Sequence, residues 1–340
     1  SISTNQERPD QQPTYRLEDS RNSARVGQPV PVQYGRLRVY PDVASKPYTE
    51  FVDHDQYLYV LLCVGEGYFD IEELRIDETP IDNFKEVEYN IVEPGDAFEL
   101  FPNPVHTVKF GVVELGVDYS SEFTATPLGV SAGRIDFDIE MPEGSFKFDP
   151  GFTSNAVVIT MQVRRIDDEG APLGDWITVE ESSQEHASVQ ALRWTFSYEV
   201  PSGEEGRYEA RAKREANTSA VSSVKDKVVW SALRAYHSEP HLDYGPRTFI
   251  EARIKATDQL NSEMAVLFNA ICTRKIHTYD GMEWSAEPQA SRSLVWAFYD
   301  ISTNGFYGAG LSGNRHDLAL LTSLDAYFEA QGWYADIRFD

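Results

Sequence analysis

The stretch Ala24–Val43, A-R-V-G-Q-P-V-P-V-Q-Y-G-R-L-R-V-Y-P-D-V, decides how the rest of this chain is interpreted. Pro29 and Pro31 remove backbone N–H donors at alternate positions, which suits an edge strand or an extended arm and not a central strand. After Gly35, apolar residues alternate with arginines, as in a half-buried strand, until Pro41 ends the run. The stretch therefore predicts a bent, extended segment that continues into a strand, with an exposed edge or a neighbour contact at the prolines.

The chain has 340 residues, enough for about two or three domains. Cys63 and Cys272 each lie in an apolar run, which predicts buried free thiols and not a disulfide or a metal pair. No apolar run approaches the ~18–20 residues that a membrane span needs, and the polar segment 1–19 lacks a signal-peptide pattern. Because the chain lacks an initiator Met and ends on the strand-like run 335–340, we expect a fragment of a longer protein.

The chain is strongly acidic: 30 Lys and Arg stand against 55 Asp and Glu, a formal net charge of −25. Residues 50–100 hold 15 acids against only Arg75 and Lys85, so about half of the net charge lies there. Nucleic-acid binding needs cations that neutralise phosphates, so this composition disfavours it. Two interpretations stay open: a solvated acidic surface that favours solubility, or an acidic channel wall past which DNA slides.

Composition divides the chain into five segments. Residues 1–20 are polar and contain two prolines, which predicts a flexible arm. Short strand-like runs between Pro, Gly and Asp predict a β-rich domain over 21–118, and longer alternating runs predict an inserted β-sandwich over 119–223. Segment 224–290 is expected to complete the first domain, and 291–340 to form a small α/β segment that continues beyond the fragment. The expected fold class is mainly β with some α.

The same patterns place individual elements. Tyr208 stands at the entry of an alternating strand, like the corner tyrosine of immunoglobulin or fibronectin type III sandwiches, so its hydroxyl is expected to bond back to the backbone. Apolar spacing predicts helices over 255–271, from Ser291 to Asn304, and from an N-cap at Asp317 to Gly332. The expected strands include Tyr57–Val64, Tyr68–Ile76, Glu88–Val92, Val105–Val113, Ile135–Ile139, Ala156–Arg165, Trp176–Glu180, Leu192–Val200 and Arg207–Arg214.

No pattern in the chain marks an enzyme. His237 and His241 have the spacing of a metal pair on a helix, but Pro240 between them indicates a loop. Asp53-His54-Asp55 is interpreted as a surface loop, and Asp167-Asp168-Glu169 as a hairpin turn and not an acid–base pair. The sequence contains no phosphate-binding loop, nucleophile elbow or reactive-cysteine pattern. We therefore expect no catalytic residue, no bound metal and no cofactor.

Four blocks of the chain resemble one protein family. The opening stretch resembles the start of the hub region in the phage tail tip attachment protein J family, the lambda-type host-specificity proteins. Three later blocks resemble that family in order and rough spacing, so the resemblance runs from about Arg21 to the end of the chain. The later blocks are Asp55–Leu58 with Gly65–Ile76 and Thr79–Ile81, Trp230–Tyr236 with Ile254–Leu260, and Trp296–Gly310 with Tyr-Gly-Ala-Gly at its end.

The resemblance implies a structural virion protein, a multi-domain β-rich tail hub with an inserted immunoglobulin- or fibronectin III-like sandwich. The family caps the tail tube with a threefold ring, which implies a homotrimer of the full-length protein, contacts with other tail tip or baseplate proteins, and a lumen that DNA crosses without specific binding. The host receptor would be bound through downstream sequence, and the expected location is the tail tip of the virion, after synthesis in the bacterial cytoplasm. The expected structural family positions are Gly27, Pro29, Pro31, Tyr34, Gly35, Tyr40, Pro41, Trp230, Trp296, Tyr307 and Gly308.

Two other functions stay open. The 18 Tyr and 6 Trp would suit a carbohydrate-active surface protein whose sandwich binds cell-wall or capsular sugar and whose paired carboxylates hydrolyse it. The chain would also suit a plain array of protein-binding sandwiches. Sugar turnover that is lost when one carboxylate is replaced would establish the enzyme.

Overall fold

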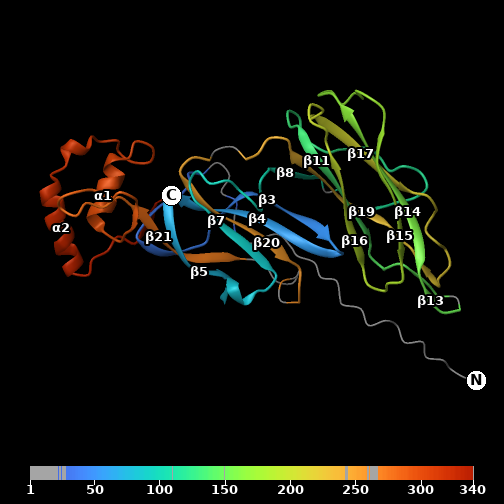
Figure 1. The fold of residues 1–340 in the computed structure, drawn as a ribbon, viewed down its shortest axis with the longest axis horizontal. Coiled ribbons are helices and arrows are strands. Elements are labelled where there is room, and N and C mark those ends of the chain that lie inside the picture. Colours follow the sequence, from blue (N-terminus) through green and yellow to red (C-terminus); the bar gives the residue numbers. More distant parts are fainter. Residues whose placement is uncertain are drawn as a thin grey trace, which may run out of the picture.

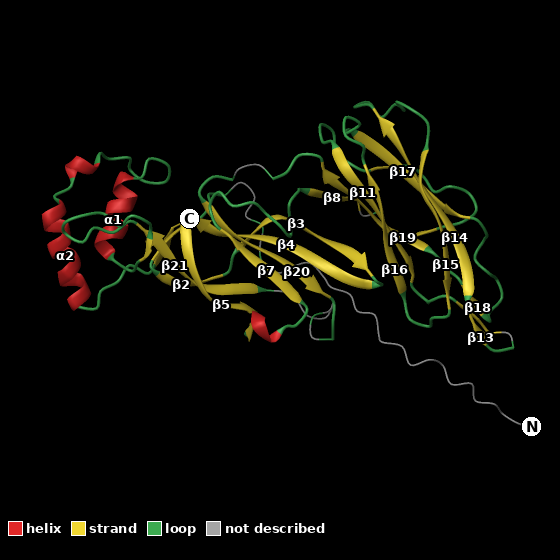
Figure 2. Ribbon diagram, viewed as in Figure 1, coloured by secondary structure: helices red, strands yellow, loops and turns green. Residues whose placement is uncertain are grey.

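The computed structural model describes residues 22, 24, 28–108, 110–148, 150–241, 244–258, 260 and 267–339. Figure 1 shows three parts in a row: a pair of helices at one end, a group of sheets in the middle and a β-sandwich at the other end. Figure 2 shows that both α-helices lie at the end far from the sandwich. The prediction of a mainly β chain with late helices is confirmed.

The sandwich consists of two antiparallel sheets that bury a shared apolar core, in which the Trp230 ring stacks on Phe137 with centroids 5.2 Å apart. One sheet has the order β16 (Leu192–Glu199), β11 (Ala132–Met141), β19 (Val229–His237), β8 (Val105–Val108), and β9 (Val113–Glu114) also pairs with β19. The other has the order β10 (Phe123–Thr124), β17 (Arg207–Arg214), β14 (Asn155–Ile166), β15 (Ile177–His186). A small sheet of β13 (Phe152–Thr153), β12 (Phe146–Phe148) and β18 (Val224–Lys225) lies beside them.

Strand pairing carries the sandwich beyond the expected bounds of 119–223. β19 pairs with β11 from Ala132↔His237 to Glu140↔Val229, and β8 pairs with the other edge of β19. The buried side chains of β19, Trp230 above all, complete the core between the sheets. Trp230, expected as a hub position, is therefore a sandwich residue. The assignment of this sandwich to the immunoglobulin or fibronectin type III class stays a prediction.

Two further antiparallel sheets, called the central sheets below, pack on a core that includes Leu58, Leu62, Ile250, Phe268 and Cys272. One has the order β2 (Arg36–Val39), β21 (Phe268–Ile276), β5 (Tyr68–Ile76), β6 (Thr79–Pro80), with β22 (Gln289–Ala290) also on β21. The other has the order β3 (Asp42–Val52), β4 (Asp55–Glu66), β20 (Arg247–Lys255), β7 (Val87–Val92), and a 3₁₀ turn covers Ile81–Asn83. Strands that precede and follow the sandwich in the sequence thus pair side by side, β4 with β20 and β5 with β21.

The second of the two late helices starts as predicted, at an Asp317 cap, whereas the first was expected to begin at Ser291 and begins after Ser293. α1 (Leu294–Thr303) is capped by Ser293, whose side chain accepts from the Trp296 amide, and α2 (Leu318–Ala330) is capped by Asp317, which accepts from the Leu320 amide. A 3₁₀ turn at Gly313–Arg315 lies between them. Beside the helices, β1 (Val32–Tyr34) pairs with β23 (Ile337–Phe339), so the opening stretch lies against the last described residues. Among the described residues, no helix is long and apolar enough to cross a membrane.

The predicted helix over 255–271 is wrong where the chain is described. Lys255 ends β20, and Phe268 and Ile271 lie in β21, which pairs on both sides with β2 and β5; Met264 lies outside the described residues. The apolar residues of β21 at alternate positions, Phe268, Ala270 and Cys272, are fully buried. Burial between two packed sheets explains the error, because a short apolar run fits a helix and a buried strand equally well. The prediction that both cysteines are buried free thiols is confirmed.

Candidate functional sites

Two of the expected family positions, Tyr34 and Tyr307, meet where β1 lies against α1. The Tyr34 hydroxyl donates to Asp300 Oδ2 at 2.5 Å, and the Tyr307 hydroxyl donates to the same oxygen at 2.6 Å. Arg274 Nη2 donates to the Tyr307 hydroxyl at 2.7 Å, and its guanidinium carbon lies 5.1 Å from the centroids of both tyrosine rings. We call Tyr34, Arg274, Asp300 and Tyr307 the Asp300 junction. It joins residues that are more than 260 positions apart in the sequence.

The two phenols of the junction act as hydrogen-bond donors to Asp300. Burial is the main cause that raises the pKa of both Tyr34 and Tyr307 well above the usual range, with the Asp300 charge adding to it, so both hydroxyls stay protonated donors. Gly67, at φ +90°, leaves room for the arginine: a Cβ there would lie 2.9 Å from Arg274 Nη2. The hydrogen bonds that two phenols donate to one carboxylate oxygen hold β1 against α1.

Two of the three family glycines, Gly35 and Gly308, lie where a side chain would collide with backbone. Gly35 has φ +75°, and a Cβ there would lie 1.6 Å from the carbonyl oxygen of Ala335. A Cβ at Gly308 would lie 2.0 Å from the carbonyl oxygen of Ile301. Trp296 is buried under α2, and its Nε1 donates to Asp325 Oδ2 at 2.8 Å. These three positions hold the helix pair onto the opening stretch.

The other expected positions are spread over the molecule. Pro29 is exposed, whereas Pro31 is buried and its carbonyl accepts from the Glu66 amide of the same chain at 3.2 Å. Tyr40 is 51% exposed, and the carbonyl of Pro41 accepts from Asn22 Nδ2 at 2.8 Å. Gly27 lies outside the described residues. In the sandwich, the Tyr208 hydroxyl donates to the Glu204 carbonyl at 2.9 Å, which is the local backbone bond that a corner tyrosine makes.

Sequence patterns missed Arg274 and Asp300. Asp300 lies inside the Trp296–Gly310 block, and Arg274 lies in β21, but neither has a spacing that marks it. The only signal for Arg274 is a charged residue in an otherwise apolar alternating run, which requires a buried partner.

A second site lies on the outer face of the β11 sheet, which carries six buried or half-buried charges, including Glu140 beside Arg193. Arg234 donates to both oxygens of Asp138, from Nη1 to Oδ2 and from Nη2 to Oδ1, the latter at 2.9 Å. Asp136 receives Arg134 through both oxygens at 2.8 and 2.7 Å, and lies 3.4 Å from Arg234. We call this group, which also includes Arg193 on β16, the charged face. Burial raises the pKa of Asp138 to about 6, against the opposing effect of Arg234 and Thr195.

The tip of the β3–β4 hairpin covers the charged face, and Figure 1 shows this hairpin reaching toward β16. The Phe51 amide donates to Thr195 Oγ1 at 2.9 Å, and His54 Nδ1 lies 2.8 Å from the Arg193 carbonyl. Glu50 accepts from Arg134 at 3.2 Å and from the Tyr236 hydroxyl. The predicted surface loop at 53–55 is therefore a tight turn, with φ 50° and 70° at its first two residues, that docks on the sandwich.

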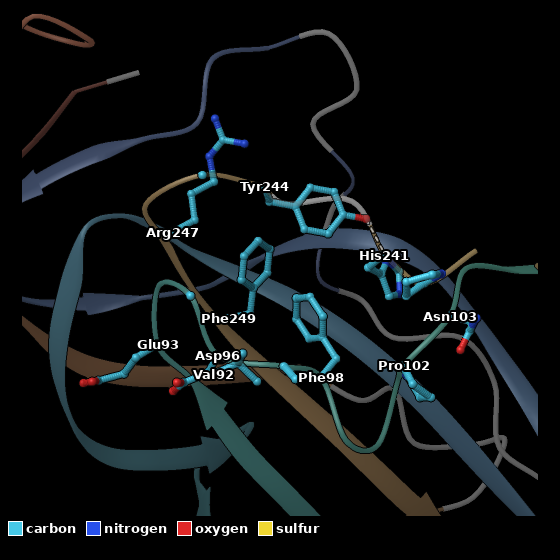
Figure 3. A pocket seen from close by; sticks show the side chains of 14 residues that line it. Val92, Glu93, Asp96, Phe98, Pro102, Asn103, His241, Tyr244, Arg247 and Phe249 are labelled. Atoms are coloured by element: carbon cyan, nitrogen blue, oxygen red, sulfur yellow. Dashed lines mark hydrogen bonds between the residues drawn. The ribbon is translucent and has the colours of Figure 1, made fainter.

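A cleft of about 470 Å³ lies between the central sheets and the loops beside them (Figure 3). Phe98, Tyr244 and Phe249 form an aromatic wall, with ring centroids 5.3–6.1 Å apart, and Arg247 lies above them in the figure. The fully buried carboxylate of Glu251 accepts four hydrogen bonds at 2.9–3.0 Å, from Asn90 and from the backbone amides of 99–101, and so fixes the loop that carries Phe98.

His241 lies in this cleft, in a loop that follows the end of β19 at His237. Its Nδ1 lies 2.7 Å from the Tyr244 hydroxyl, whereas its Nε2 is buried with no hydrogen-bond partner among the described residues. Burial, then the nearby His237, lowers the pKa of His241 to about 4, so the ring is neutral at pH 7. No group of three or more His, Cys, Asp or Glu in the described chain is arranged to hold a metal.

Comparison with known proteins gives few matches. No family model and no curated protein matches the chain. Among solved structures, the T13 viral particle of IBDV aligns at 7% identity over 75% of this chain and 59% of that chain, with a TM-score of 0.23. The VP2 subviral particle of infectious bursal disease virus aligns at 7% identity over 74% of this chain and 82% of that chain, with a TM-score of 0.24. TM-scores of this size do not establish a shared fold or function.

Proposed function

We propose that this chain is a structural part of a phage or prophage tail tip hub, which closes the tail tube and carries host-attachment parts during adsorption and DNA ejection. The observation that carries the proposal is the interleaved pairing of β4 with β20 and β5 with β21 around an intervening sandwich. This is the architecture implied by the resemblance, in which a hub domain is completed after an inserted module.

The contacts of the resembling blocks support the same proposal. Tyr34 and Gly35 of the opening block touch Asp300, Tyr307 and Ala335 in or near the last block. Blocks that only happened to share sequence patterns would have no reason to pack on one another. The two glycines, which leave room for close backbone contacts, are residues that such a junction requires.

The partners and location follow from the proposal. The full-length protein would form a homotrimer in the virion tail tip, contact other tip or baseplate proteins, and bind the host receptor through downstream sequence. Its net charge of −25 would let DNA pass the lumen without binding. We propose no enzymatic role, because the carboxylates of the Asp300 junction and of the charged face are paired with phenol or arginine groups.

Electron microscopy of the full-length protein tests the proposal. We expect a threefold ring whose lumen is lined by the acidic segment 50–100. A monomer, or a ring with these acids on its outer rim, would contradict it. Because downstream segments of such a protein would drive assembly, the full-length protein is the sample that decides, and the 340-residue chain serves as a control for whether it trimerises alone.

A further inference from the structure

A second cavity, of about 360 Å³, lies at the end of the molecule far from the sandwich, between α1, α2 and the segments on either side of them. It is independent of the junctions described above: none of the residues of the Asp300 junction or the charged face lines it. The residues that line it include Asp280, Arg292, Asp325, Glu329, Trp333 and Tyr334.

Two aromatic side chains at this cavity are half open to solvent. Trp333 is 52% exposed and Tyr334 is 46% exposed, although both lie in a turn that is held in place. The Trp333 amide donates to the Phe328 carbonyl at 2.9 Å, and the Ala335 amide donates to the Arg292 carbonyl at 2.9 Å. Large exposed aromatic side chains on a fixed backbone, next to a cavity, are typical of a binding surface.

The polar groups of the cavity are held in fixed positions. Asp325 accepts from the Ser293 hydroxyl through one oxygen and from Trp296 Nε1, at 2.8 Å, through the other. Asp280 Oδ1 accepts from the backbone amides of Met282 and Glu283 at 2.8 and 2.9 Å. Each carboxylate oxygen has two lone pairs, so the two oxygens of Asp325, which accept one hydrogen bond each, keep acceptor capacity beside the cavity.

Glu329 lies one helical turn after Asp325 on α2. Its side chain is exposed and makes no hydrogen bond or ion pair within the described part of the chain. The one cation here, Arg292, is already used: it pairs with Asp336 through two bonds and lies 4.2 Å over the Tyr334 ring. The cavity therefore offers aromatic surface and hydrogen-bond acceptors, with an uncompensated negative charge.

We propose that this cavity binds a neutral saccharide. The C–H face of a pyranose ring packs on an aromatic side chain, and vicinal hydroxyls donate to carboxylates, so Trp333 and Glu329 supply the chemistry that such a ligand needs. Tyr334, whose ring Arg292 covers on one face, lies beside them. The negative charge of Asp280, Asp325 and Glu329 repels sialic acids and other acidic sugars. A volume of about 360 Å³ accommodates one or two sugar rings.

The site binds and does not hydrolyse. Both oxygens of Asp325 already accept hydrogen bonds, and Asp325 and Glu329 lie on one face of one helix. A glycosidase needs two carboxyl groups on opposite sides of the scissile bond, roughly 5–10 Å apart. The sugar-binding site does not depend on the tail hub proposal.

Isothermal titration calorimetry of this chain tests the site, with chitotriose and maltotriose as neutral probes and 3′-sialyllactose as the acidic probe. We expect binding of at least one neutral probe with a Kd of about 1 mM or below, and binding of the acidic probe at least about ten-fold weaker. Trp333→Ala should weaken neutral-sugar binding about ten-fold or more, and Glu329→Gln about three-fold or more. Tyr40→Ala, which removes an equally exposed tyrosine elsewhere, should leave it unchanged.

Each possible result decides the matter. No heat with either neutral probe up to about 10 mM, or equal binding by the parent chain and Trp333→Ala, overturns the site. Stronger binding of the acidic probe overturns the assignment to neutral sugars. Both replaced residues are exposed, and Glu329→Gln keeps the side-chain shape, so loss of binding by that variant reports on the site and not on folding. A threefold ring that binds no sugar would retain the hub proposal and remove this one.

Discussion

The Asp300 junction and the charged face, called the two joints below, hold neighbouring parts of the molecule together by different interactions. At the Asp300 junction, β1 and the helix pair meet through close backbone contacts at glycine and through two phenols on one carboxylate. At the charged face, the β3–β4 hairpin meets the sandwich over ionised side chains, with Arg134 and Arg234 each bound to carboxylates that are almost fully buried. The first joint depends on shape and the second on charge.

The two joints therefore tolerate substitutions differently. Backbone packed against Gly35 leaves no room for a larger side chain, so the contact beside the Asp300 junction does not tolerate substitution of this glycine. A buried ion pair contributes little net stability, because desolvation offsets most of the attraction, but removing one partner is costly. The charged face therefore selects which surface can cover it more than it strengthens the contact.

The largest expected effect comes from breaking the charged face. Arg234→Ala should lower the free energy of unfolding by about 3–5 kcal/mol, because Asp138 would stay buried without its main partner. Urea denaturation measures the loss, and hydrogen exchange should show faster opening of the hairpin tip around Phe51. Lys225→Ala, which removes an exposed ion pair with Glu143, should cost no more than about 0.5 kcal/mol.

A double variant tests whether charge itself is needed. Arg234→Met with Asp138→Leu should recover most of the loss, since apolar groups of similar size replace a buried pair at little cost. If the single variant loses less than about 1 kcal/mol, the charged face is not buried as described, and the contrast between the joints disappears.

A smaller effect is expected at the other joint, from a single methyl group. Gly35→Ala should cost about 3 kcal/mol, because its Cβ would lie 1.6 Å from the Ala335 carbonyl oxygen and would separate β1 from β23. Gly129→Ala is the matched control: its φ is +77° against +75°, but no atom lies within 4 Å of the added Cβ, so it should cost only about 1 kcal/mol. Equal losses in urea denaturation would show that backbone conformation, and not close packing, makes Gly35 necessary.

The sequence predicted the positions of elements better than their partners. Strand β5 and the N-cap of α2 follow from alternation and a capping residue, which are local signals. The charged face was not predicted, because Asp136 and Asp138 alternate with core residues as solvent-exposed positions would, and their burial depends on tertiary contacts such as the docking hairpin. Arg274 and Asp300 were missed for the same reason: their pairing is a tertiary contact that no local spacing encodes.

The smallest expected effect is the pH dependence of stability that arises from His241 in the aromatic cleft. The pKa of His241 is about 4 in the folded chain and near 6.5 when unfolded, so between these pH values the unfolded chain binds more protons. Stability should therefore fall as pH is lowered through this window. Because the ring is only half-buried, we expect His241 to account for about 1 kcal/mol between pH 7 and pH 4.5, measured by urea denaturation.

Two variants separate the titration of His241 from its packing. His241→Asn keeps an acceptor for the Tyr244 hydroxyl but removes the titrating ring, so its stability should fall less on acidification than that of the parent chain. Tyr244→Phe removes the hydrogen bond and leaves the ring buried, so the pH dependence should persist. If His241→Asn keeps the full dependence, then the other histidines with lowered pKa values, His106, His186 and His237, are responsible, and the acid sensitivity belongs to the sandwich side of the contact and not to the cleft.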